Sequence, residues 1–236
     1  KSFDLLISIG GDGTILRAVT YIRDLDIPIL GINTGRLGFL ATINKTAIEE
    51  SVNLILDGDY SIQERTLLAV KTTPKTEKFS ELNFALNEVT IARKNTTSMI
   101  GVKTCLNEEY LTNYWADGLI IATPTGSTGY SLSCNGPVIS PDSKNLVITP
   151  IAPHNLNARP MVIADDTQIK LTIDSREKDF LISLDSRITT VAKNTVVHIK
   201  KASFTIKSII PKNQSFLQTL RTKLLWGEDT RNETNL

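Results

Sequence analysis

One stretch decides the fold: Phe3-Asp-Leu-Leu-Ile-Ser-Ile9-Gly10-Gly11-Asp12-Gly13-Thr14. A hydrophobic run leads into three glycines placed around one aspartate. The run is typical of a buried parallel strand, so we predict a strand over residues 3–9. Apolar residues then recur at helical spacing, at Ile15, Leu16, Val19 and Ile22, which predicts a helix to about Arg23.

The turn between this strand and helix is suited to phosphate. Its glycines let a ligand approach the main chain, and the helix start offers unpaired N–H groups and a positive dipole end. A carboxylate at Asp12 is unfavourable beside phosphate unless it has a task, such as removing a proton or contacting a metal. The alternative is that Asp12 only caps the helix.

The following residues continue an α/β pattern. A second short strand is predicted over residues 27–32, which gives a strand–helix–strand unit. The glycine-bearing loop Asn33-Thr-Gly-Arg-Leu-Gly-Phe39 follows it, at the sheet edge where α/β proteins bind ligands. Thr46 and Glu49 then have the spacing of a capping box, which predicts a helix from there to Gly58.

From about Tyr60 the pattern changes to many short strands. We predict strands at 67–72, 84–92, 100–106, 118–122, 146–151, 168–173, 179–184 and 196–199. The predicted fold is therefore a Rossmann-like α/β domain over residues 1–62 followed by an all-β domain over 63–210. Residues 216–226 have helical spacing, and the segment 211–227 that contains them is predicted to pack back onto the first domain. Residues 228–236 are predicted to be a disordered tail.

Composition excludes several classes of protein. The chain has 236 residues, 41% hydrophobic and 22% charged, with 26 basic and 25 acidic side chains and a net charge of +1. This balance does not favour a nucleic-acid or membrane partner. Cys105 and Cys134 are too few for a disulfide framework, which favours a reducing, cytoplasmic location. Because the first residue is Lys1, we expect some N-terminal sequence to be missing.

A second informative stretch begins at Asp117. A short apolar strand ends at Thr123-Pro124, and a Gly/Ser/Thr-rich turn runs on through Tyr130 to Ser133. Hydroxyl groups at this density can surround a ligand with donors and acceptors, while Tyr130 covers a flat base. The alternative is a polar loop that merely turns the chain.

Taken together, the motifs resemble those of the NAD kinases. They are Gly10-Gly-Asp-Gly-Thr14, Asn33–Phe39, Asn87-Glu88, Thr123–Ser133 and Pro150–Pro160, in that order, and the likeness extends to about Trp226. It implies transfer of the γ-phosphate of ATP to the 2′-hydroxyl of the adenosine ribose of NAD. It also implies that the family's first strand and helix are absent here.

The resemblance implies a role for each candidate residue. Asp12 is the general base, and Gly10, Gly11, Gly13 and Thr14 hold the phosphates of ATP. The NAD contacts are assigned to Asp12, Gly13, Arg17, Phe39, Asn87, Glu88, Asp117, Thr128, Gly129, Tyr130, Ser131, Leu132, Ser133 and Arg187, with His154, Trp115 and Ser98 as further candidates. No residues have metal-ligand spacing, so Mg²⁺ or another divalent cation is expected to arrive with ATP. A homodimer or homotetramer is also implied.

The sequence departs from the family at a few positions. Trp115 stands where many bacterial members carry a basic residue, and Arg187 where relatives often have glutamine. Arg187 is a candidate to offset the charge lost at Trp115. Of the two histidines, His154 lies in a proline-flanked loop as a binding candidate, whereas His198 is expected to be structural.

Three other functions fit part of the pattern. A diacylglycerol or sphingosine kinase shares the glycine-rich loop, but it needs a membrane-facing surface. A phosphofructokinase shares the loop as well, but no arginine-rich sugar-phosphate site is evident. A nucleotide-sensing module would bind NAD or NADP without turnover, and the intact Asp12 disfavours it.

Overall fold

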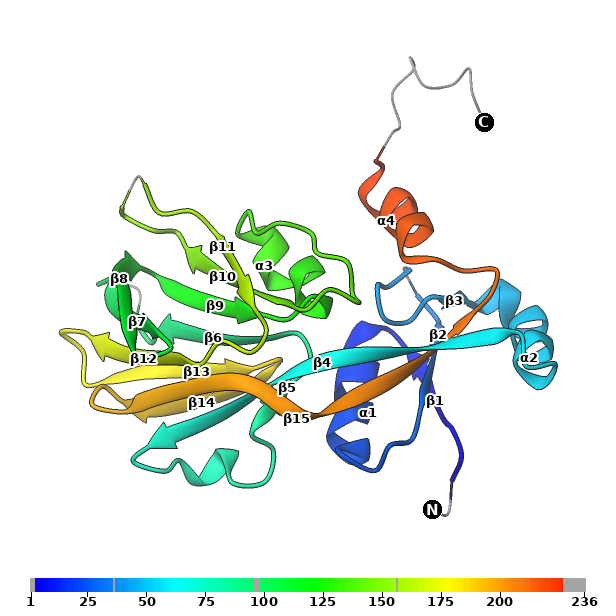
Figure 1. Ribbon diagram of the computed structural model, residues 1–236, viewed down its shortest axis with the longest axis horizontal. Helices are drawn as coiled ribbons and strands as arrows, with labels where there is room; N and C mark the ends of the chain where they lie inside the picture. Colours follow the sequence, from blue (N-terminus) through cyan, green and yellow to red (C-terminus); the bar gives the residue numbers. More distant parts are fainter. Residues whose placement is uncertain (1–2, 36, 96–97, 156, 227–236) are drawn as a thin grey trace. The chain divides into compact units, whose positions relative to one another are not determined.

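The computed structural model describes residues 3–35, 37–95, 98–155 and 157–226 and separates the chain into two compact units (Figure 1). Unit 1 comprises Lys1–Glu64 and Ile206–Leu236, and unit 2 comprises Arg65–Thr205. Two long strands, β4 (Tyr60–Thr73) and β15 (Val196–Pro211), belong to both units. The predicted tail at 228–236 lies outside the described residues.

Unit 1 is built on parallel strands with helices beside them. The strands are β1 (Leu6–Gly10), β2 (Ile29–Asn33) and β3 (Ile43–Asn44), and the helices are α1 (Asp12–Ile22), α2 (Ile48–Leu56) and α4 (Phe216–Leu224). Strand β2 pairs in parallel with β1, with β3 and, at Ser208, with β15. Leu30, Ile32, Ile43 and Ile209 form a buried cluster on this sheet. Unit 1 is therefore an α/β unit.

The capping box predicted from Thr46 and Glu49 at the start of α2 is wrong. A 3-10 turn, η1 (Lys45–Ala47), precedes the helix, and the Asn44 side chain accepts the N–H of Thr46 at 3.4 Å. Asn44 has extended backbone at the end of β3, so it takes the capping position two residues before Thr46. Thr46 lies inside the turn, and α2 itself begins after Ala47 without a side-chain cap.

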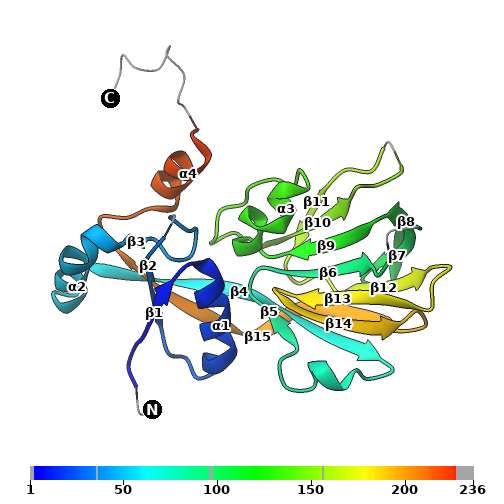
Figure 2. The same ribbon diagram turned by 180° about the vertical axis from the view of Figure 1, so that it is seen from behind.

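Unit 2 contains two sheets. One is six-stranded and antiparallel, in the order β11 (Met161–Ala164), β10 (Asn145–Ile151), β9 (Gly118–Ala122), β6 (Glu88–Arg93), β13 (Asp179–Leu184), β14 (Arg187–Ala192) (Figure 2). In the other, β15 is followed by β12 (Ile169–Asp174), β7 (Ile100–Leu106) and β8 (Glu109–Ala116), while β4 pairs with β15 and with β5 (Phe84–Ala85). Unit 2 is therefore β-rich.

Side chains from both sheets fill one core. Ile91, Ile121 and Phe180 of the first sheet and Val102 and Leu171 of the second belong to the same buried cluster, each at 0% exposure. Alternation along each strand sends every second side chain into this core, as packed antiparallel sheets require. On β9 and β10 the opposite face is apolar as well, because Ile120, Ala122 and Val147 form a second buried cluster with Ile139.

The predicted strands are present, with differences at their ends. The segment predicted as one strand at 84–92 is divided into β5 and β6 by Leu86 and Asn87. Four strands, β3, β8, β11 and β14, were not predicted. Strands β3 and β11 have only two and four residues, and β8 and β14 carry several polar residues among their apolar ones. None of the helices in the described part of the chain is long and apolar enough to be a membrane span.

Candidate functional site

In unit 1, the Asp12 carboxylate holds the loop that follows β2. Asp12 Oδ2 accepts the N–H of Phe39 at 2.8 Å, and Oδ1 accepts those of Leu40 at 3.1 Å and Ala41 at 3.0 Å. Asp12 is the first residue of α1, whose N-cap is Gly11. The alternative in which Asp12 caps its own helix is therefore wrong, because its carboxylate crosses to another segment.

Two glycines make this geometry possible. A Cβ on Gly38 would lie 1.8 Å from Asp12 Oδ1, so only glycine lets the loop approach the carboxylate. Gly10 has a φ of 154°, and a Cβ there would lie 2.2 Å from Thr14 Oγ1. Gly11 and Gly13, by contrast, have open space where a Cβ would be, and both are exposed at the start of α1.

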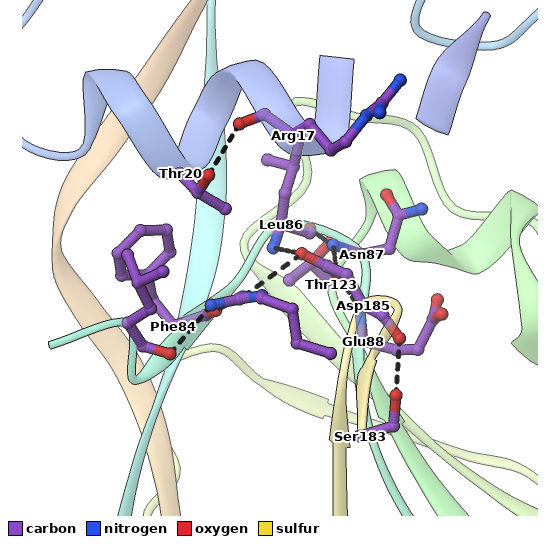
Figure 3. A network of polar contacts seen from close by, with 11 residues as sticks. Arg17, Thr20, Phe84, Leu86, Asn87, Glu88, Thr123, Ser183 and Asp185 are labelled. Carbon is purple, nitrogen blue, oxygen red and sulfur yellow. Dashed lines mark hydrogen bonds and ion pairs between the residues drawn. The ribbon is translucent and has the colours of Figure 1, made fainter. Parts of the chain in front are cut away.

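Helix α4 packs on the same loop. The Phe216 ring lies 6.4 Å from the Phe39 ring, and the Lys223 amine lies 4.5 Å from the centre of the Phe39 ring. Phe39 is therefore held from one side by its backbone bond to Asp12 and from another by α4. Arg17, on α1, is exposed, and its carbonyl accepts the Thr20 hydroxyl at 2.7 Å (Figure 3).

In unit 2, the Asp185 carboxylate gathers three successive backbone N–H groups. They belong to Leu86 at 3.0 Å, Asn87 at 2.8 Å and Glu88 at 3.3 Å (Figure 3). Thr123 holds the carbonyl groups of the same segment. Its hydroxyl donates to the Leu86 carbonyl at 2.6 Å, and its backbone N–H donates to the Asn87 carbonyl at 2.9 Å. These bonds replace the strand ladder, which explains why β5 and β6 are separate strands.

The fixed segment presents polar atoms that have no partner. Asn87 Oδ1 and Glu88 Oε2 are buried and make no hydrogen bond within the described part of the chain. Burial, and then the charge of Asp185, raises the pKa of Glu88 from 4.5 to about 8. A hydrogen bond from the Tyr130 backbone lowers this pKa, but by less. Burial also raises the pKa of Asp185, although its three N–H donors and Arg187 favour the charged form. Buried polar atoms without partners are rare, and a ligand that supplies them explains such a pair.

The turn after β9 lies against this segment. It consists of η3 (Thr125–Thr128) and α3 (Tyr130–Ser133). A Cβ on Gly126 would lie 2.0 Å from the Asn87 carbonyl oxygen, and one on Gly129 would lie 3.0 Å from Glu88 Oε2. The two glycines therefore allow the turn and the Asn87-Glu88 segment to meet.

The side chains of this turn fall into two groups. Ser131 is buried, with its Oγ 2.8 Å from Thr149 Oγ1, so it supports the turn from below. Tyr130 is 45% exposed and Ser133 is also exposed, while Thr128, Gly129 and Leu132 are half-buried. Burial, followed by the charges of Cys134, Asp117 and Glu88, raises the pKa of Tyr130.

A third set of predicted residues meets at the start of β9. Asp117 forms an ion pair with Arg93 at 2.9 Å, and its N–H donates to the Ile151 carbonyl at 2.9 Å. The backbone N–H of His154 donates to the Trp115 carbonyl at 2.8 Å. Trp115, Asp117 and His154 are thus close together, and the Trp115 ring is partly exposed.

Arg187 and Ser98 are placed differently. The Arg187 guanidinium donates to the carbonyls of Leu82, at 2.8 Å, and Phe84, and lies 5.4 Å from the centre of the Phe84 ring. It is also 3.8 Å from Asp185. Arg187 therefore braces the segment before Asn87, and its contact with NAD stays a prediction. Ser98 is half-buried, and its hydroxyl has no partner among the described residues.

Sequence reasoning missed Asp185, Gly38 and Gly126 as site residues. Asp185 is a turn residue with a φ of 53°, between two alternating strands, which was its only local signal. Nothing in the spacing links it to the segment 97 to 99 positions earlier that it holds. Gly38 and Gly126 stood inside quoted motifs, but only the folded structure shows which atoms they approach.

A divalent cation has no ready-made cage in the described residues, where no three His, Cys, Asp or Glu side chains come together as a metal site. Mg²⁺ characteristically keeps several waters and binds through substrate phosphates with one or two carboxylates. The carboxylate of Asp12 beside an exposed helix start fits an ion delivered on a nucleotide, in which case the protein would supply few ligands.

Two family models match the chain. The ATP-NAD kinase N-terminal domain matches residues 1–60, and the ATP-NAD kinase C-terminal domain matches residues 86–211. The chain is 60% identical over 232 residues to the NAD kinase of Flavobacterium psychrophilum, covering 98% of this chain and 79% of that protein. It is 47% identical over 228 residues to the NAD kinase of Bacteroides fragilis, covering 97% and 78%.

Two solved structures are similar as well. Yeast NADH kinase complexed with NADH has a TM-score of 0.86 and 26% identity, over 96% of this chain and 67% of that one. An NAD kinase from Archaeoglobus fulgidus in complex with ATP has a TM-score of 0.81 and 27% identity, over 95% and 84%. The likeness extends through both units.

Replacing Gly38 with alanine is predicted to destabilise the protein. The new Cβ would overlap Asp12 Oδ1, so the loop must retreat and loosen the N–H bonds to the carboxylate. We expect the free energy of unfolding, measured in urea, to fall by about 1–3 kcal/mol. Gly13→Ala is the control, because Gly13 lies in α1 with open space where a Cβ would be. The free energy of unfolding of this variant should rise by about 0.5–1 kcal/mol. Equal effects of the two substitutions would contradict the close approach at Gly38.

Replacing Asp185 with alanine is predicted to release the segment at 86–88. Three N–H groups lose their acceptor, and Arg187 loses its ion-pair partner. We therefore expect the free energy of unfolding to fall by about 3–5 kcal/mol. Asp179→Ala is the control, because that carboxylate forms only a partly exposed ion pair with Lys94, worth less than about 1 kcal/mol. If the two variants unfold at the same urea concentration, Asp185 does not hold the segment.

The raised pKa of Glu88 predicts a pH dependence of stability. Between its ordinary pKa of 4.5 and its folded pKa of about 8, the folded protein binds a proton that the unfolded chain does not. Stability should therefore fall as pH rises through this window, by at most about 1.4 kcal/mol per pH unit from Glu88. The Glu88→Gln variant should lose this part of the slope when both proteins are unfolded in urea from pH 5 to pH 8. Identical slopes would show that Glu88 is not protonated in the fold.

Proposed function

The chain belongs to the NAD kinase family, and from this membership we propose which of its residues carry out the family's reaction. The reaction is the transfer of the γ-phosphate of ATP to the 2′-hydroxyl of the adenosine ribose of NAD. The resemblance inferred from the motifs is confirmed, since both family models match and relatives are 60% identical over nearly the whole chain. This likeness to NAD kinases through both units disfavours the lipid kinase and phosphofructokinase alternatives.

We assign the general base to Asp12, and the observation that carries the proposal is its hydrogen bonding. Three backbone N–H groups fix the orientation of the carboxylate, and they leave acceptor capacity on its two oxygens. A ribose hydroxyl is a poor nucleophile, so a fixed carboxylate within hydrogen-bond reach can accept its proton as the attack begins. The held geometry spares the enzyme the cost of orienting this group during the reaction.

The start of α1 is proposed to hold the phosphates of ATP. Gly11 and Gly13 are exposed there and have no side chain to obstruct the approach of a ligand. N–H groups in the first turn of a helix and its dipole favour anions, and phosphoryl transfer depends mostly on such electrostatic stabilisation. Mg²⁺, when bound with ATP, would neutralise phosphate charge, and Asp12 and Thr14 are the residues of this turn whose side chains carry oxygen atoms that could bind it.

Residues of unit 2 are proposed to hold NAD. The unpartnered Asn87 Oδ1 and Glu88 Oε2 suit the hydroxyl groups of a ribose, and the exposed Tyr130 ring suits its adenine. Thr128, Gly129 and Ser133 border the same turn, and Asp117 with Trp115 and His154 forms a second group for the nicotinamide end. Helix α4 is proposed to complete unit 1 by fixing Phe39. The homo-oligomer, the divalent cation and the cytoplasmic location stay predictions from the resemblance.

Replacing Asp12 with asparagine tests its role as the base. With NAD, ATP and Mg²⁺ supplied, we expect the kcat for NADP formation to fall by about 10²- to 10⁴-fold, because the amide cannot take the proton. Asparagine keeps the size of the side chain, and its amide oxygen can still accept the N–H groups of Leu40 and Ala41, so the KM for NAD should rise much less than kcat falls. Asp24→Asn is the control, an exposed residue outside the site that should leave the rate unchanged.

Two outcomes would contradict the assignment. Near-full NADP production by a folded Asp12→Asn protein would mean that another group accepts the proton. A raised KM with an unchanged kcat would show that Asp12 only holds the loop.

An unmodified protein that binds NAD but makes no NADP would favour the nucleotide-sensing alternative.

A further inference from the structure

Unit 2 contains a cavity of about 630 Å³ whose lining includes none of the residues assigned to NAD or ATP. It opens among strands β4, β12 and β15 and the segment from Lys75 to Asn83. Small-molecule sites commonly measure about 300–1,000 Å³, so the cavity has the size of a ligand site. The established reaction gives it no role.

The lining of this cavity is strongly basic. Four lysines contribute to it, Lys71, Lys75, Lys170 and Lys200, together with His198. Its one carboxylate is Glu108, which forms an ion pair with Lys170 at 3.0 Å. Within the described part of the chain, no ion pair forms on Lys71, Lys75 or Lys200. The cavity therefore has uncompensated positive charge in a protein whose net charge is only +1.

The register of the sheet sets three of these side chains side by side. Lys170 of β12 stands opposite His198 of β15, and Lys200 lies two residues further along β15, on the same face. Their neighbours Ile169 and Ile199 point the other way, into the core between the sheets. Strand pairing thus gathers the amines of Lys170 and Lys200 and the imidazole of His198 on one face, which is a fixed property of the fold.

The rest of the lining suits an organic group. Ala69 and Phe79 contribute apolar surface to the cavity. The nearby turn is ordered by Thr72, whose hydroxyl accepts the N–H of Thr76 at 2.9 Å. A single inorganic phosphate would contact few of the spaced lysines and would leave most of the cavity unfilled.

We propose that this cavity binds a phosphorylated organic anion of the nucleoside phosphate class, at a site separate from those for the two substrates. Its phosphates would meet Lys71, Lys200 and the Lys170–His198 pair, and its organic part would lie against the apolar lining. The proposal is independent of the assignment of Asp12, because no residue is shared.

The two histidines allow a direct test by NMR of protein labelled at histidine Cε1. His198 lines the cavity, whereas His154 lies with Trp115 and Asp117, so each signal reports one place. Titration with ADP in the absence of divalent cations should shift the His198 signal in a saturable way. The signal is assigned from the His198→Asn protein, in which it is missing.

The charge-reversal variant Lys71→Glu/Lys200→Glu should weaken the ADP dependence of the His198 shift by at least tenfold. The matched control is Lys144→Glu/Lys178→Glu, which reverses two exposed lysines outside the lining and should titrate like the unmodified protein. An unchanged rate of NADP formation by both variants verifies that they fold.

Inorganic pyrophosphate separates the two parts of the proposal. Weaker binding of pyrophosphate than of ADP supports a site for an organic phosphate, and equal binding overturns that part. No shift of the His198 signal with either probe, or equal titration of both lysine variants, overturns the site itself.

Discussion

A carboxylate that accepts three backbone N–H groups in succession is the interaction on which the candidate residues of each unit depend. Asp12 holds residues 39–41 in unit 1, and Asp185 holds residues 86–88 in unit 2. In each case the accepting residue is far along the chain from the segment that it holds, and the segment has left the regular ladder of its sheet. Charge-assisted bonds to N–H groups are stronger than neutral ones and need no second side chain. The fold can therefore shape a loop at a strand end while leaving its side chains free for a ligand.

The glycines of the motifs follow from these loops. Gly38 has to admit the Asp12 carboxylate, Gly126 the carbonyl of Asn87, and Gly129 the carboxylate of Glu88. At Gly38 and Gly126 a Cβ would occupy space that a polar atom already fills, and at Gly129 it would make a tight contact. Packing does not explain the glycines at positions 11 and 13, since no protein atom lies near the places where their Cβ atoms would be. The same residue type thus serves internal packing at some positions and leaves room for a ligand at others, which the sequence alone does not separate.

The sequence predicted what depends on local pattern. The strand–turn–helix at residues 3–23 and the regular strands such as β7, β9 and β13 were found because apolar periodicity defines them. The α2 cap was assigned wrongly, because Asn44 competes for the same turn and only the path of β3 decides between them. Asp185 was missed for a stronger reason: its partners are nearly one hundred residues away, and their spacing carries no signal. Long-range polar contacts of this kind are set by topology, so they appear only once the sheets are paired.

The contrast between the two kinds of carboxylate suggests how the site divides its work. Asp12 has both oxygens in hydrogen bonds and its orientation fixed, which suits its proposed role as the general base. Glu88 has a buried oxygen without a partner, and burial, followed by the charge of Asp185, raises its pKa to about 8. Without a ligand, this unsatisfied oxygen is a cost to the protein. In the proposed binding mode, a ribose that supplies the missing hydrogen bonds would relieve this cost, and that relief would contribute to binding. A ligand without those hydroxyls leaves the cost in place, so the unsatisfied atoms provide discrimination as well as affinity.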